Sequence, residues 1–421
     1  MAKESSGKSG EWKVGARSLV SASWFKVTLL GLAIRLLVAP FSTGADSSGW
    51  FAGARMIASL SLQQALTAGT TVPVFWWMNA LIYGAWHLLT GKIEPFILWP
   101  LWPDYLLNCL LKIPAITADI LTGVVLYQIL RRLGRIDQAI IALKLWMFNP
   151  LVIGIVAMWG SSWDIVSAFF ALLAIYLYAE HRPYLSALSL GLGIAWKLWP
   201  AILLPVFLVD LIKEKQKLRM VPIVAISALP LIVVSLPRLV LAPVAQPATT
   251  FSEYAEIYWI FGYNIGSDWA PGYVPLTLSI MVLLVFLVLQ SWHFEDNLER
   301  INQFAICLLM TYFGLSIIAM QFSIWPLPFL ILDYARNRKK GYIFWGYTGA
   351  AIASLIFGWA PSSFIYLLIP PSSPRHIFGS EMLISQMSVG LVDAIQKVSR
   401  GIFCGSSLAY VAYGVKRYFL R

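Results

Sequence analysis

Three charged residues lie in surroundings where they could do chemistry: Asp46, Asp164 and Lys197. Asp46 follows the first long apolar run, in the segment TGADSSG. A single carboxylate at a membrane surface can deprotonate a hydroxyl nucleophile. An aspartate at this position is also suited to cap a helix that begins at Ser47, and by residue type alone the cap is the favoured role.

Asp164 and Lys197 are associated with later apolar runs. Asp164 follows WGSSW at the start of one run, where an N-cap and a binding role are compatible. Lys197 lies within GIAWKLWP, and a cation inside an apolar run is costly. Its ammonium group could extend to the membrane interface. Because its expected side is the external one, against the usual trend for basic residues, we favour a bound anion such as a lipid phosphate.

Segment 242–272, expected outside the membrane, combines acidic and aromatic residues. Carboxylates accept hydrogen bonds from sugar hydroxyls, and aromatic rings cover the apolar face of a sugar. An interfacial aromatic belt explains the rings alone and is the favoured interpretation of them. The acids are Glu253, Glu256 and Asp268, and the rings include Tyr254, Tyr258, Trp259, Tyr263 and Trp269.

Metal and nucleotide chemistry have no visible motif in the sequence. The three cysteines form no paired spacing, and the 4 histidines are scattered. Serines follow Asp46, so the second carboxylate that a divalent ion would need is missing there. No P-loop or dinucleotide-binding fingerprint is present. We therefore expect no cofactor, and a divalent metal is the less favoured alternative.

The composition indicates the kind of scaffold that must position these residues. Of the 421 residues, 59% are hydrophobic and only 12% are charged, and the mean hydropathy is +0.73. A soluble domain would be roughly half apolar and about a quarter charged. The apolar runs are continuous rather than alternating, which favours helices over a barrel. We predict an all-α polytopic membrane protein in which residues 1–421 form a single domain.

A spanning helix needs about 20 apolar residues, and fewer where protein surrounds its ends. The sequence has about twelve runs that meet this requirement. Among them, the short pair 184–197 and 199–212 contains Pro200 and Pro205, which predict a broken or kinked element. The predicted spans are 24–41, 105–130, 139–158, 164–180, 184–197, 199–212, 221–241, 273–291, 304–320, 324–335, 341–359 and 400–415.

Basic residues in short loops indicate the orientation in the membrane. They lie in the tail 1–23, after the second, fourth, sixth and tenth spans, between the eighth and ninth spans, and at the C-terminus. With these spans, all of them fall on one side, so both termini are predicted to be cytoplasmic. The net charge of +11 then needs no nucleic acid to explain it.

Residues 74–90 are apolar enough to resemble a further span, but a crossing there would place Arg131, Arg132 and Arg135 outside. We therefore predict a juxtamembrane or re-entrant helix at 74–90, because its tryptophan and tyrosine residues suit the lipid headgroup region. The whole of 42–104 then becomes one long external loop, and 242–272 is the second.

Four segments of the chain resemble the GT-C-fold membrane glycosyltransferases, close to the PIG-M-like and prokaryotic polyprenol-phosphate-mannose-dependent mannosyltransferases. MQFSIWPLPF is a later and weaker match, and the segments together cover much of 30–335. The four are the first span with the following GADSSGWFAGARM, then KIPAITADILTGVVLYQILRRLG, LWMFNPLVIGIVAMWGSSWDIVSAFFALLAIYLY and GLGIAWKLWPAILLPVFL.

The resemblance implies transfer of a sugar, usually mannose, from a polyprenyl-phosphate-linked donor to a hydroxyl of a lipid or glycan acceptor. The reaction would invert the anomeric centre on the external or lumenal face, with Asp46 as the general base. We assign the cation that stabilises the leaving phosphate to Lys197 first and to Arg55 second. The residues expected at the substrate are Asp164, Trp163 and Gln321.

The expected partners are the lipid-linked donor, a glycolipid or glycan acceptor, membrane lipid and a small membrane subunit. The expected location is the cell membrane of a prokaryote, or the endoplasmic reticulum of a eukaryote. A transporter or lipid flippase is the alternative from another class, although many secondary transporters have two similar halves. Here the long first external loop has no counterpart after the sixth span. A non-catalytic partner of a glycosylation complex is a further alternative, for which Asp46 would be dispensable.

Overall fold

The computed structural model describes residues 8–43, 47–67, 73–98, 102–159, 162–213, 215–241, 297–315, 320–338, 341–359, 364–365, 378–379 and 387–418. Helices account for nearly all of these residues. Several of them are long and apolar enough to cross a membrane. The prediction of an all-α membrane protein is therefore confirmed.

The N-terminal third begins with one long helix and continues with three shorter ones. The elements are α1 (Lys8–Val38), η1 (Ala39–Phe41), α2 (Ser47–Ala58), α3 (Leu62–Thr67) and α4 (Pro73–Thr90). Two short strands follow, β2 (Phe96–Leu98) and β3 (Trp102–Pro103), which pair antiparallel.

The middle third consists of packed helices joined by short turns. It comprises α5 (Tyr105–Arg132), α6 (Ile136–Met147), α7 (Pro150–Ile153), the π-helix η2 (Gly154–Trp159), α8 (Ser162–Ala179), α9 (Pro183–Trp196), η3 (Trp199–Leu203), α10 (Leu204–Lys213), η4 (Lys217–Arg219) and α11 (Met220–Leu241).

The C-terminal third completes the bundle and adds a small sheet. Its helices are α14 (Asn297–Leu315), η5 (Met320–Ile324), α15 (Leu327–Arg336), α16 (Gly341–Ser354), the π-helix η7 (Leu355–Trp359) and α18 (Val389–Tyr418). Strand β1 (Ser42–Thr43) pairs antiparallel with β4 (Phe364–Ile365), which pairs with β5 (Phe378–Gly379). In this sheet Ser42 lies opposite Ile365.

Local sequence explains where α5 begins and ends. The Asp104 carboxylate caps the helix by accepting hydrogen bonds from the backbone N–H groups of Leu106 and Leu107. It also accepts a hydrogen bond from Trp86 Nε1 at 3.0 Å, which ties α4 to the start of α5. At the other end, Gly134 has a φ of +71°, the left-handed conformation that commonly terminates helices and that glycine adopts without strain.

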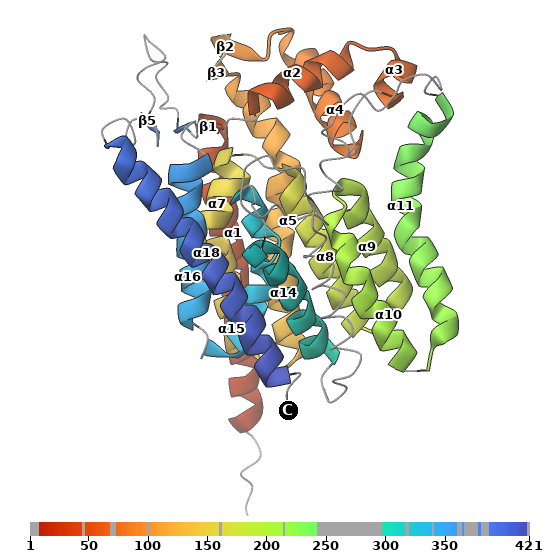
Figure 1. The fold of residues 1–421 in the computed structure, drawn as a ribbon, viewed down its shortest axis with the longest axis vertical. Coiled ribbons are helices and arrows are strands. Elements are labelled where there is room, and N and C mark those ends of the chain that lie inside the picture. Colours follow the sequence, from red (N-terminus) through yellow and green to blue (C-terminus); the bar gives the residue numbers. More distant parts are fainter. Residues whose placement is uncertain are drawn as a thin grey trace, which may run out of the picture.

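The helices form a bundle with two different ends (Figure 1). Helices α2, α3 and α4 lie across one end, the upper one in Figure 1, which we call the capped end. Helix α1 begins and α18 ends at the opposite end, which we call the distal end. The start of α1 and the end of α18 thus lie on the same side, as expected if both termini face one compartment.

A fully buried ion pair holds the first helices together in the bundle. Arg35 of α1 and Asp119 of α5 are both 0% exposed and form a salt bridge. Trp146 of α6 donates to the same carboxylate at 2.7 Å, and Arg35 donates to the Met147 carbonyl at 2.8 Å. Asp119 is therefore a buried structural contact, and it is the partner of Arg35.

The predicted spans coincide with helices wherever their residues are described. Span 139–158 is bent by 42° between α6 and the following helix, and the pair 184–212 is broken between α9 and η3. The pair is short: α9 has 14 residues and is about 21 Å long, against about 30 Å for a bilayer core. Span 273–291 and loop 242–272 lie outside the described residues.

Among the described residues, three helices are long and apolar enough to cross a membrane, or up to four if the bent pair counts as one span. They are Ser23–Phe41, Tyr105–Arg132 and Lys217–Pro237, and the bent pair runs from Ile136 to Met158. Helix α4 is not among them, and neither are α8, α9 and α16, which coincide with predicted spans. The total of about twelve crossings and the placement of α4 beside the membrane stay predictions.

Candidate functional site

The structure brings together two of the candidate residues, Asp164 and Lys197. Asp164 lies in the first turn of α8, and Lys197 follows the last residue of α9 in an extended conformation. A short turn joins α8 to α9, so the two helices run antiparallel and the start of one meets the end of the other. Lys197 Nζ lies 2.9 Å from Asp164 Oδ1, within salt-bridge distance.

Aromatic side chains enclose this ion pair. Trp325 donates from Nε1 to Asp164 Oδ1 at 2.6 Å. The Lys197 ammonium lies 3.9 Å from the centroid of the Phe322 ring and 5.1 Å from that of Trp325, within cation–π range. Trp199 stacks on Trp325 with the ring centroids 5.2 Å apart. We call Phe322, Trp325 and Trp199 the aromatic box.

A short hydrogen-bond chain fixes the box against α8. Trp199 Nε1 donates to Ser167 Oγ at 2.7 Å, and Ser167 Oγ donates to the Asp164 carbonyl at 3.0 Å. Asp164, Ser167 and Trp199 are buried at 2%, 0% and 1% exposure respectively, counting the side chain for Asp164. The ion pair is therefore held on a rigid support, which is what a binding site for a specific geometry requires.

Lys197 is more exposed than Asp164, so an incoming ligand can reach the ammonium group but not the carboxylate. The Asp164 side chain is 2% exposed, whereas that of Lys197 is 16% exposed. An ammonium group has three N–H donors, of which the Asp164 contact uses one. Lys197 can therefore donate to an incoming anion while it remains paired with Asp164.

Gln321 lies beside this cluster in the chain. It belongs to η5, next to Phe322 of the aromatic box. Its Oε1 is buried and accepts no hydrogen bond from the described residues. Buried amide oxygens are rarely left without a donor, so a ligand hydroxyl is a suitable partner for it.

A second cluster holds the chain between the end of α1 and strand β1. Lys112 of α5 is 3% exposed, and Nζ donates to the carbonyl of Ala39 at 2.9 Å, to that of Ala157 at 3.0 Å and to that of Ser42. Asn108, one turn earlier, donates to the Ser42 carbonyl at 2.9 Å. These two side chains clamp the end of α1 and of η1 against the end of η2.

The remaining candidates stand as follows. Asp46 lies outside the described residues, between Thr43 of β1 and Ser47 of α2. Trp163 belongs to the first turn of α8, and its side chain lies outside the described part of the structure. Arg55 of α2 forms a salt bridge of 2.6 Å with Glu94, and both side chains are largely exposed at 41% and 59%.

Arg55 therefore belongs to the capping helices, and no hydrogen bond or ion pair between described residues joins it to Lys197. No group of three metal-ligating residues lies together among the described residues. The expectation that no metal takes part stays a prediction.

Several residues of the site were not singled out by sequence reasoning. Trp325 and Phe322 lie in MQFSIWPLPF, the weaker of the matching segments, which was the only signal for them. Lys112 could have been found from the sequence, because it is a cation inside a predicted span, which is the property that makes Lys197 a candidate. Ser167 and Asn108 had no signal in the sequence.

Comparisons with known proteins give one family match and two curated relatives. The sequence model of a family described as GPI transamidase subunit PIG-U matches residues 93–310, slightly more than half of the chain. GPI mannosyltransferase 1 from Kluyveromyces lactis is 28% identical over 115 residues, 27% of this chain and 28% of that protein. The protein of the same name from Candida albicans is 30% identical over 96 residues, 22% of this chain and 24% of that protein.

The chain therefore covers less than a third of the length of these curated relatives. The family match includes Asp164 and Lys197, whereas Asp46 and Gln321 lie outside it. Together the comparisons confirm the resemblance to a GT-C-type membrane glycosyltransferase.

Proposed function

We propose, from the premise that this chain belongs to the family of the GPI transamidase subunit PIG-U, that it is a membrane mannosyltransferase. The donor is a polyprenyl-phosphate-linked mannose, and the acceptor is a hydroxyl group of a glycolipid or glycan. The local similarity to GPI mannosyltransferase 1 supports the sugar, and the Lys197–Asp164 pair supports the lipid-phosphate donor.

One observation carries the proposal. The Lys197 ammonium lies against the aromatic box within an apolar bundle, and its contact with Asp164 uses only one of its three N–H donors. The acceptor oxygen attacks the anomeric carbon, the bond from that carbon to the phosphate oxygen breaks, and polyprenyl phosphate leaves. Negative charge grows on the leaving phosphate, and Lys197 stabilises it. Asp46 takes the proton from the attacking hydroxyl.

Other residues of the cluster have supporting roles in this proposal. Asp164 orients Lys197, and Gln321 accepts a hydrogen bond from a sugar hydroxyl. Trp163 contributes to the substrate surface, and Arg55 is the second choice for the phosphate. No metal is needed. The reaction face is the capped end, on the external or lumenal side, in the endoplasmic reticulum if the chain is eukaryotic.

The test combines purified protein, polyprenyl-phosphate-mannose and a panel of acceptors, with products identified by mass spectrometry. Asp46→Asn should lower turnover by about 10²- to 10⁴-fold, the usual contribution of a general base. Asp137→Asn is the matched control, because Asp137 is an exposed aspartate at the start of α6, at the distal end. Turnover at the wild-type level in Asp46→Asn would disprove the general-base role.

A second function has its own support, because the matched family is described as a transamidase subunit. In that case the same cluster holds a glycolipid without reacting, and Asp164 keeps Lys197 in place for its phosphate. Wild-type protein would then transfer no sugar to any acceptor. It would still bind a mannosylated lipid phosphate, and Lys197→Met would weaken this binding. Transfer by the wild type would exclude this second function.

A further inference from the structure

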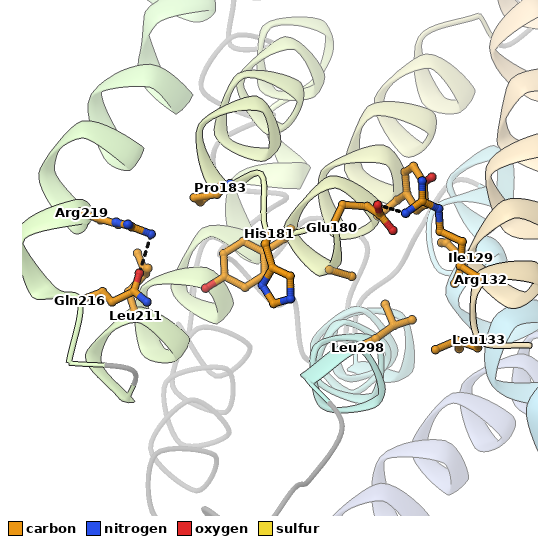
Figure 2. A pocket seen from close by; sticks show the side chains of 13 residues that line it. Ile129, Arg132, Leu133, Glu180, His181, Pro183, Leu211, Gln216, Arg219 and Leu298 are labelled. Atoms are coloured by element: carbon orange, nitrogen blue, oxygen red, sulfur yellow. Dashed lines mark hydrogen bonds and ion pairs between the residues drawn. The ribbon is translucent and has the colours of Figure 1, made fainter.

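The distal end of the bundle contains a cavity of about 740 Å³ that the proposed reaction does not use. Figure 2 shows the side chains around it, which come from the ends of several helices. Asp164 and Ala179 are separated by 15 positions along α8, so the cavity lies roughly 22 Å from the Lys197–Asp164 pair. It is therefore a separate site.

Basic side chains line this cavity at two places. Arg219 of η4 donates to Gln216 Oε1 at 2.8 Å and forms no ion pair with any described carboxylate. Arg132 at the end of α5 forms a salt bridge with Glu180 and lies over the ring of Tyr176, 5.6 Å from its centroid. Figure 2 shows the Arg219 and Arg132 groups on opposite sides of His181.

Two unusual backbone conformations border the same cavity. Among the described residues other than glycine, only His181 and Lys215 have positive φ, at 57° and 58°. His181 lines the cavity, and Lys215 immediately precedes Gln216, which also lines it. Such conformations are uncommon outside glycine and tend to occur at ligand sites. Both residues end a helix, and their turns bring His181 and Gln216 to the rim of the cavity.

The remaining lining of the cavity is apolar. Ile129 and Leu133 extend the wall beside Arg132, and Leu298 of α14 lies between the two basic groups (Figure 2). The volume is in the usual range for small-molecule sites, about 300–1,000 Å³. The cavity thus has Arg219, which pairs with no carboxylate among the described residues, on one side and the apolar wall on the other, and this combination suits an anion that is attached to a hydrocarbon chain.

We propose that this cavity binds the phosphate headgroup of an anionic membrane phospholipid, with Arg219 as the main contact. Glu180 neutralises Arg132, whereas the charge of Arg219 is available to the phosphate. His181 and Gln216 add donors at the rim, and the first part of the acyl chain lies along Ile129, Leu133 and Leu298. Basic pockets between membrane helices bind lipid headgroups in this way.

The test uses the full chain, purified in detergent with phosphatidylglycerol and phosphatidylcholine in known ratio, and native mass spectrometry counts the lipids that are retained. We expect phosphatidylglycerol to be retained by the wild type and to bind about fivefold more weakly to Arg219→Gln. Lys217→Gln is the matched control, because Lys217 is an exposed cation of the same η4 that does not line the cavity.

A second variant tests the cavity without changing its charge. Leu133→Trp fills space at an exposed position of the wall, and it should also reduce the retained phosphatidylglycerol. Unfolding temperatures in phosphatidylcholine alone show whether the variants are folded. Equal retention in Arg219→Gln and the wild type, or an equal loss in Lys217→Gln, would overturn the proposal. So would displacement of the lipid by millimolar inorganic phosphate, which would identify a site for the free ion.

Discussion

The Asp164–Lys197 pair should affect stability and sugar transfer differently, and a double-mutant cycle separates the two effects. At 2.9 Å and an effective dielectric constant of about 20, the Coulomb attraction is roughly 6 kcal/mol, and most of it offsets the desolvation of the two charges. Removing one partner leaves the other charge without compensation. Because Asp164 is 2% and Lys197 16% exposed, we expect Asp164→Asn or Lys197→Met to lower the free energy of unfolding by about 3 kcal/mol.

The double variant Asp164→Asn/Lys197→Met removes both charges, so most of this stability should return. Sugar transfer should not return with it, because the ammonium that stabilises the leaving phosphate is still missing. Loss of one such donor lowers kcat by about 10²- to 10³-fold. Denaturant titration in detergent micelles measures the stability of the four proteins, and product formation at saturating lipid-linked donor measures kcat.

Arg55→Met tests the second choice for the phosphate, and its effect on stability should be small, because Arg55 forms an exposed salt bridge with Glu94 that should contribute at most about 1 kcal/mol. Normal transfer by a stable Asp164→Asn/Lys197→Met variant would refute the phosphate role of Lys197. The lysine would then serve only as the partner of Asp164. A large loss of transfer in Arg55→Met, with no change in stability, would move the phosphate role to Arg55.

Three further predictions concern the scaffold. Arg35→Met or Asp119→Leu alone should cost about 3–5 kcal/mol by chemical denaturation, since each leaves a buried charge unpaired, and the double variant should recover most of it. Burial tends to raise the pKa of Asp104, but hydrogen bonds from Lys92, the Leu107 backbone N–H and Trp86 outweigh this and hold the pKa below its usual value. Its stabilising contribution should therefore be present above about pH 4 and lost as the pH falls through the folded-state pKa, and Asp104→Asn should remove this part of the acid unfolding curve. A cysteine replacing the exposed Ile93, in a background without other cysteines, should react with an impermeant maleimide from outside, and labelling from the cytoplasm would show that α4 crosses the membrane.

The candidate site could be predicted from the sequence in part. Asp164 and Lys197 were recognised singly, because a charge in an apolar run is costly wherever it lies. Their pairing depends on the antiparallel packing of α8 and α9, which brings residues 33 positions apart into contact. Trp325 is 161 positions from Asp164, and no local pattern connects the two residues.

The fold could also be predicted in part, because the positions of the long helices follow from hydrophobicity, whereas the pairing of distant segments does not. Long apolar runs identify helices, so the positions of α1, α5 and α11 follow directly from the sequence. The bend between α6 and α7 also has a local signal, because Asn149 caps α7 and Pro150 is its first residue, whereas no local pattern predicts the π-helices η2 and η7. The pairing of Ser42 with Ile365 joins distant segments, and neither segment has a strand pattern of its own.

The clamp formed by Asn108 and Lys112 is needed for both proposed functions, whereas Asp46 is needed for only one of them. The two side chains hold the backbone carbonyls of Ala39 and Ser42. Backbone carbonyls cannot act as an acid or a base in the reaction, so the role of the clamp is structural. A transferase needs such a clamp to position the chain that leads to Asp46, and a subunit that only holds a glycolipid needs it equally. Lys112→Met should therefore impair either function. Asp46→Asn keeps the clamp and the shape of the side chain but removes the base, so only a transferase should lose its activity.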